Sequence, residues 1–208
     1  MGGRGSSSGV GIGGGGGSGE RIISTDDLLS RRERQQNEVD QVLGVLRDIN
    51  TQYGYEVDGL DVATLGRGSK AMGYYEPGSN NIGINERFFD AQKIQQAYDK
   101  TVASGVHPSA GNKTGLEAVI AHETGHALTD VVAQKLGKDF DATAGQIVGE
   151  AFKAKTSAGA KKIAGNISGY ARQSDAECVA EAFADVYCNG RNASKESKQI
   201  VNVLKKYL

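Results

Sequence analysis

Apolar residues recur at helical spacing in several separate stretches of the chain. Within residues 26–53, Val39, Val42, Leu43, Leu46 and Ile49 share one face, which predicts an amphipathic helix ending near Gly54. The same spacing predicts helices over 87–104, near 143–155 and over 194–207. Residues 60–86 instead break into short runs: a weak strand at 61–65, and a hairpin of 71–75 and 81–85 around a turn-rich break. This order predicts an α+β fold, a small sheet with helices packed around it.

A further helix, over residues 115–136, carries clear signals at both ends. Thr114 and Glu117 have the spacing of a capping box, and Gly137 is a typical helix stop. Apolar residues such as Val119, Ile120 and Leu128 flank its polar centre on both sides. We therefore expect this helix to be buried.

The centre of that helix reads His122-Glu123-Thr124-Gly125-His126. Because a helix turns about 100° per residue, the two histidines lie on one face and can converge on one metal ion. Glu123 points to the side, where it can take a proton from a metal-bound water rather than bind the metal. The alternative is an amphipathic helix with two histidines on its polar side. The chain has only three histidines, and two of them are here, which favours a zinc site.

A catalytic zinc ion with two histidine ligands needs a third protein ligand. The remaining histidine, His107, lies upstream in a Gly/Ser/Pro loop and is expected at the surface, so a carboxylate is expected instead. A second helix, predicted over 175–188, offers Glu177, Glu181 and Asp185 along one face. Glu177 can equally complete a capping box with Ser174, and Glu181 and Asp185 can form a solvated face.

Composition limits the other functions that need to be considered. The chain has 208 residues and a net charge of −1, which gives no electrostatic case for nucleic acid or a membrane surface. Residues 1–20 are mostly Gly and Ser and are expected to form a disordered tail, leaving 21–208 as one domain. We expect no signal peptide and no transmembrane segment. Cys178 and Cys188 are too far apart on one helix to pair, which suits a reducing compartment. The lysines at 153, 155, 161 and 162 are expected to be solvated.

Two blocks of the sequence resemble the catalytic domain of anthrax lethal factor and related metallopeptidase-like domains of phages and mobile elements. The first block is His122-Glu-Thr-Gly-His126-Ala. The second is Tyr170-Ala-Arg-Gln-Ser-Asp-Ala-Glu177-Cys-Val-Ala-Glu181-Ala-Phe, which begins 44 residues after His126. The family pattern is approximately H-E-x-G-H-A followed by Y-x-R-x-x-x-x-E-x-x-A-E-A-F. The resemblance covers roughly residues 70–208 and identifies a gluzincin-type domain.

This resemblance implies a role for each matching residue. It implies that His122, His126 and Glu177 are ligands of one Zn²⁺ ion per chain and that Glu123 is the general base. It further implies that Tyr170 stabilises the oxyanion and that Glu181 orients a ligand histidine. Without the resemblance, Tyr170 would be interpreted as an ordinary half-buried tyrosine.

The resemblance also implies a zincin-like fold and a zinc metalloendopeptidase, encoded by a phage or mobile element. Its partners would be protein or peptide substrates, with phage capsid components among the candidates, and its location cytoplasmic or virion-associated. One alternative is a non-catalytic phage module with a zinc site retained for folding. Another is a metallopeptidase toxin or effector. Glu123, which a structural zinc site does not need, favours an enzyme.

Overall fold

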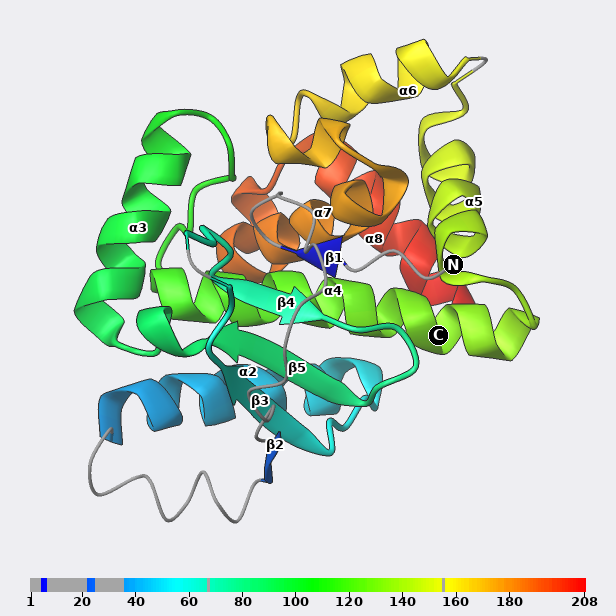
Figure 1. The fold of residues 1–208 in the computed structure, drawn as a ribbon. Coiled ribbons are helices and arrows are strands. Elements are labelled where there is room, and N and C mark those ends of the chain that lie inside the picture. Colours follow the sequence, from blue (N-terminus) through cyan, green and yellow to red (C-terminus); the bar gives the residue numbers. More distant parts are fainter. Residues whose placement is uncertain (1–4, 7–21, 25–35, 67, 155) are drawn as a thin grey trace.

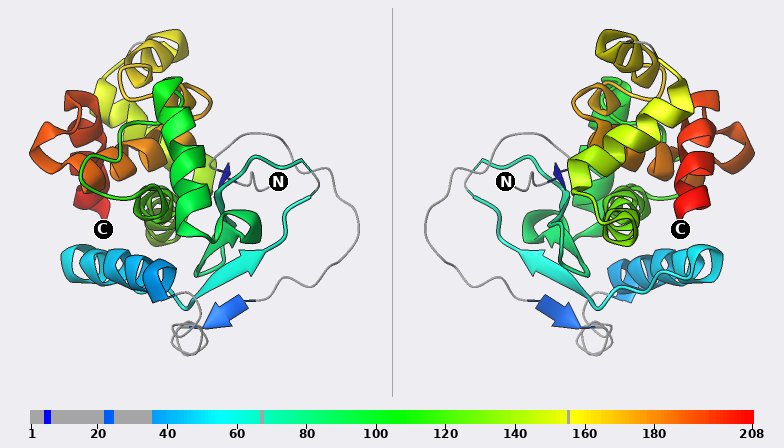
Figure 2. Two further views of the ribbon diagram at one scale, coloured as in Figure 1. Left: turned by 90° about the vertical axis from the view of Figure 1, so that its left-hand side faces the viewer. Right: turned by 90° about the vertical axis from the view of Figure 1, so that its right-hand side faces the viewer.

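The chain folds as an α+β protein, as predicted, with a sheet on one side and most of the helices on the other (Figures 1 and 2). A computed structural model describes residues 5–6, 22–24, 36–66, 68–154 and 156–208. The expected tail over residues 1–20 lies outside these ranges, except for Gly5 and Ser6.

The sheet has the strand order β1-β4-β5-β3-β2. The predicted hairpin is present as β4 (Gly73–Tyr75) and β5 (Asn81–Asn85), and the turn between them contains Gly78 with a φ of 87°. The strand expected at 61–65 is β3 (Gly59–Ala63), which pairs in parallel with β5. At the two ends, β1 (Gly5–Ser6) pairs with β4 and β2 (Ile22–Ser24) pairs with β3, both antiparallel.

Seven α helices are present among the described residues, and most follow the predicted ranges. They are α2 (Gln36–Tyr53), α3 (Ala91–Ala103), α4 (Gly115–Leu136), α5 (Phe140–Phe152), α6 (Ser157–Ala164), α7 (Asp175–Asn189) and α8 (Lys195–Tyr207). Two helices begin elsewhere than expected because an aspartate caps each of them: Asp90 starts α3 and Asp139 starts α5. The short helix α6, capped by Thr156, was not predicted.

Helix α4 is the central element of the fold. Both halves of its capping box form, since Glu117 N–H donates to the Thr114 hydroxyl and Thr114 N–H donates to the Glu117 carboxylate. Gly137 ends the helix in the left-handed conformation, with a φ of 61°. The helix packs against β4 and β5 on one side and against α7 on another, so it is buried along most of its length. Its central histidines therefore lie inside the protein.

Several other expectations can be compared with the structure. None of the described helices is long and apolar enough to cross a membrane. Cys178 and Cys188 are both buried and do not form a disulfide, as predicted. The lysines at 153, 161 and 162 are exposed, as predicted, and Lys155 lies outside the described residues.

Candidate metal centre

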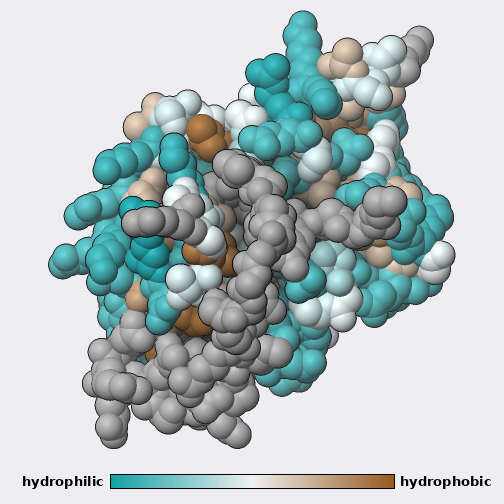
Figure 3. All heavy atoms as spheres, viewed as in Figure 1, coloured by the Kyte–Doolittle hydropathy of each residue, from teal (hydrophilic) through white to brown (hydrophobic). Residues whose placement is uncertain are grey.

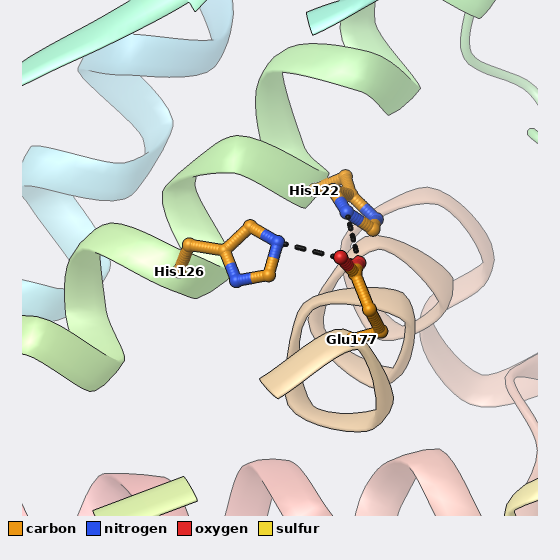
Figure 4. A group of neighbouring side chains, drawn as sticks. All are labelled: His122, His126 and Glu177. Atoms are coloured by element: carbon orange, nitrogen blue, oxygen red, sulfur yellow. Dashed lines mark ion pairs between the residues drawn. The ribbon is translucent and has the colours of Figure 1, made fainter. Parts of the chain in front are cut away.

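Helices α4 and α7 bring three potential metal ligands together. His122 and His126 lie one turn apart on α4, and Glu177 lies in the first turn of α7 (Figure 4). The Glu177 Oε2 atom is 3.2 Å from His122 Nε2 and 3.4 Å from His126 Nε2. One ligand atom from each residue lies within 4.8 Å of the others, so the group could hold a metal ion.

The burial of these atoms supports a bound cation. His122, His126 and Glu177 are only 3%, 0% and 7% exposed. Their converging atoms, the two Nε2 atoms and Glu177 Oε2, form no hydrogen bond within the described part of the chain. Buried polar atoms in proteins nearly always have a partner, and two imidazole nitrogens with a carboxylate oxygen are a common donor set for transition metals. The residues therefore fit a metal ion.

The two interpretations of Glu177 both describe part of its environment. The Ser174 hydroxyl accepts a hydrogen bond from the Glu177 backbone N–H and caps α7. The Glu177 carboxylate does not complete a capping box with Ser174 but lies against the histidines of α4. The side chain of Glu177 therefore belongs to the cluster, and its main chain to the cap.

Glu123 lies beside these residues and is fully buried. Strand β4 passes directly over it: a Cβ atom on Gly73 would lie 2.7 Å from Glu123 Oε1 and 2.8 Å from Val119 Cγ1. Such distances are too short for any side chain, so a glycine is required for this close approach. Glu123 is thus held between the cluster and the sheet.

Tyr170 reaches the cluster from a short 3-10 turn (Tyr170–Arg172) just before α7. It is 3% exposed, and its hydroxyl donates to Glu177 Oε1 over 3.4 Å. The main chain before it is fixed by two hydrogen bonds, in which Gly169 N–H and Tyr170 N–H donate to the carbonyls of Gly105 and Val106. The loop after α3 therefore determines where Tyr170 lies.

Glu181 lies behind the cluster and not on a solvated face. It is 1% exposed, and its Oε1 atom is 2.8 Å from His122 Nδ1. Its Oε2 atom accepts a 2.6 Å hydrogen bond from the Ser168 hydroxyl. Because a carboxylate only accepts hydrogen bonds, this contact keeps the His122 proton on Nδ1 and leaves Nε2 for a metal.

Asp185 is also buried, but it does not take part in the cluster. Its carboxylate accepts hydrogen bonds from Ser194 N–H, the Ser197 hydroxyl and the Asn189 amide. These contacts join the end of α7 to the start of α8. Its position one turn after Glu181 on α7 therefore serves the packing of helices.

The prediction that His107 lies at the surface was wrong. His107 is 4% exposed, and its Nδ1 atom forms a 2.8 Å hydrogen bond with Glu181 Oε1. Its ring stacks on Tyr98 and lies 5.2 Å from the Tyr170 ring, measured between centroids. All three histidines of the chain thus belong to one buried region. The only sequence signal for this was the small number of histidines.

The buried charges of this region shift one another's pKa values. Burial alone would raise the pKa of Glu177 and Glu181, but the nearby histidines lower both to about 2. Burial would also lower the pKa of His122, but its contacts with Glu177 and Glu181 raise it well above the ordinary value. Both carboxylates are therefore ionised at neutral pH, and the region favours a positive charge between them, carried by a proton or by a metal ion.

Comparisons with known proteins add no family assignment. No protein-family model, no curated protein and no solved structure matches this chain.

Proposed function

We propose that this protein is a zinc-dependent metalloendopeptidase of the zincin-like, lethal-factor-like type. The observation that carries the proposal is the convergence of His122 Nε2, His126 Nε2 and Glu177 Oε2 from two helices. Three protein ligands leave a position for water or substrate, as in catalytic zinc sites, whereas structural zinc sites usually have four.

The chemistry assigns a different task to each residue around the metal. When bound, a zinc ion would polarise a peptide carbonyl and make water acidic enough to react at neutral pH. Glu123 would accept the proton of the attacking water and pass it to the leaving amine. Tyr170 would donate a hydrogen bond to the negative charge that develops on the carbonyl oxygen. Glu181 would keep His122 in the tautomer that binds metal.

The cleft side of the site would be formed by β4. Gly73 allows this strand to contact Glu123, so a peptide extended along β4 would pass close to the proposed base. Main-chain hydrogen bonding to a strand is a common way to hold an extended peptide. This supports a peptide bond, rather than a small molecule, as the substrate.

The test combines metal analysis with one substitution at Glu123. Elemental analysis of the purified protein should find one zinc per chain; because two histidines and a carboxylate also bind Fe²⁺, the metal found decides the identity. Glu123→Gln should keep the metal and the fold but lower peptide cleavage by about 100-fold or more, since an amide cannot act as a base. Glu56→Gln, at an exposed position after α2, is the matched control. A parent protein that binds zinc but cleaves no peptide, or a Glu123→Gln variant with undiminished cleavage, would contradict the proposal.

A further inference from the structure

An open cavity of about 500 Å³ lies between α3 and the residues leading into β4. Its apolar part is formed by Met72, Phe88 and Ala97, of which Met72 is almost fully buried. Figure 3 shows hydrophobic side chains between hydrophilic ones on the left of this face, where Figure 1 places α3 and β4. The cavity therefore offers apolar contact within a polar rim.

The rim of this cavity is strongly basic. Lys70, Arg87, Lys93 and Lys100 line it, and the lining contains no aspartate or glutamate. Lys93 pairs at 3.8 Å with Asp90, which also caps α3. Lys70, Arg87 and Lys100 have no carboxylate partner within the described ranges. Arg87 instead lies over the Phe88 ring, 5.4 Å from its centroid. Since the whole chain carries a net charge of −1, this concentration of positive charge is local.

Met72 connects the cavity to the candidate metal centre. Its side chain also borders a small space lined by His107, Val119, His122 and Glu181. The next residue, Gly73, contacts Glu123. From Lys70 to Gly73 there are three residue steps, which span about 11 Å at most in an extended chain. A peptide held along β4 would advance about 3.3 Å per residue, so the basic rim lies within about three substrate residues of the proposed base.

We propose that this cavity is a specificity pocket for an acidic side chain of the peptide substrate, within about three residues of the cleaved bond. A glutamate side chain fits the chemistry, because its methylene groups can contact Met72 and Phe88 while its carboxylate meets the basic rim. The inference rests on the proposed peptidase function and assigns it a substrate class, acidic peptides.

The test compares binding and cleavage of defined synthetic peptides. Pools of fluorescent decapeptides would each have Glu, Gln or Lys fixed at one position, with the other positions mixed. Binding would be measured with zinc-loaded Glu123→Gln protein, which should hold peptides without cutting them, and cleavage with the parent protein. At one position the Glu pool should bind about fivefold more tightly than the Gln pool, because each exposed ion pair contributes up to a few-fold.

Charge reversal then separates this pocket from general electrostatics. The double variant Lys70→Glu and Lys100→Glu changes two exposed cavity residues and should abolish the preference for Glu or reverse it towards Lys. Lys161→Glu with Lys162→Glu, on α6, changes the net charge equally away from the cavity and should preserve the preference. Equal binding of Glu and Gln pools by the unreversed protein, or a preference unchanged in the cavity variant, would overturn the inference. Selective binding of Glu pools without cleavage by the parent would support the pocket and count against the proposed peptidase activity alone.

Discussion

The closest approach between the two helices of the metal centre is at Gly125. A Cβ atom added to Gly125 would lie 2.7 Å from the Ala180 Cα and 3.1 Å from the Phe183 Cβ, both on α7. Ordinary contacts of a Cβ atom begin at 3.4 Å, so Gly125→Ala would push α7 back by about 0.7 Å, from 3.4 minus 2.7. The obstructing atom belongs to the main chain, so a side-chain rotation cannot relieve the clash.

This displacement should affect metal binding more than stability. Alanine is about 1 kcal/mol better than glycine inside a helix, whereas overpacking a core costs about 1–3 kcal/mol. The net loss of unfolding free energy should therefore be about 2 kcal/mol or less. Metal sites tolerate distance errors of only about 0.2 Å, and α7 carries Glu177 while α4 carries the histidines. We expect Gly125→Ala to weaken zinc binding by about 100-fold or more.

The assay pairs chelator competition for zinc affinity with denaturant unfolding of the metal-free protein. Gly149→Ala is the matched control, since Gly149 is exposed on α5 and an added Cβ atom would meet nothing within 4 Å. That variant should gain about 1 kcal/mol of unfolding free energy and bind zinc like the parent. If Gly125→Ala binds zinc as tightly as the parent, the contact between α4 and α7 does not set the geometry of the ligands.

Two further predictions concern the carboxylates and the third histidine. Glu177→Ala should lose far more zinc affinity than Glu181→Ala, which should lose about 10–100-fold as a group that only orients a ligand. Chelator competition measures both, and the reverse order would make Glu181 the ligand. His107→Ala should lower zinc affinity by about 10-fold, because Glu181 loses a donor on the atom that contacts His122. His107→Asn, whose amide nitrogen can occupy the place of Nδ1, should recover most of it; if it recovers none, the hydrogen bond to Glu181 is not what His107 contributes.

The sequence predicted α4 well because its signals are local. Thr114, Glu117 and Gly137 are close in the chain to the groups they satisfy, and helical spacing alone places His122 and His126 on one face. The first turn of α7 was predicted for the same reason, through Ser174. Helix α6, with eight residues, was missed because it is too short to show an apolar period clearly.

The missed contacts arise between segments that are distant in the chain. His107 is buried because the loop after α3 pairs with residues 169–170 and because Glu181 accepts its proton, and nothing beside His107 in the sequence signals either. The parallel pairing of β3 with β5 likewise passes over β4, which a hairpin pattern does not reveal. The proximity of Tyr170 to Glu177 was expected only from a family resemblance, and the 3.4 Å contact is consistent with it.

The charges buried around α4 and α7 would be a poor solution for a protein that needed only a stable core. Glu177 and Glu181 are ionised and almost inaccessible to water, and an uncompensated buried charge costs several kcal/mol. Apolar residues of similar volume often stabilise such positions better than buried ionic groups do. Without a metal, the proton on His122 reduces this cost, but it also occupies the nitrogen or the charge that a metal would use. A divalent cation compensates both carboxylates through His122, His126 and Glu177 at once. The arrangement is therefore best explained by a bound metal ion that contributes to folding and to the proposed chemistry alike.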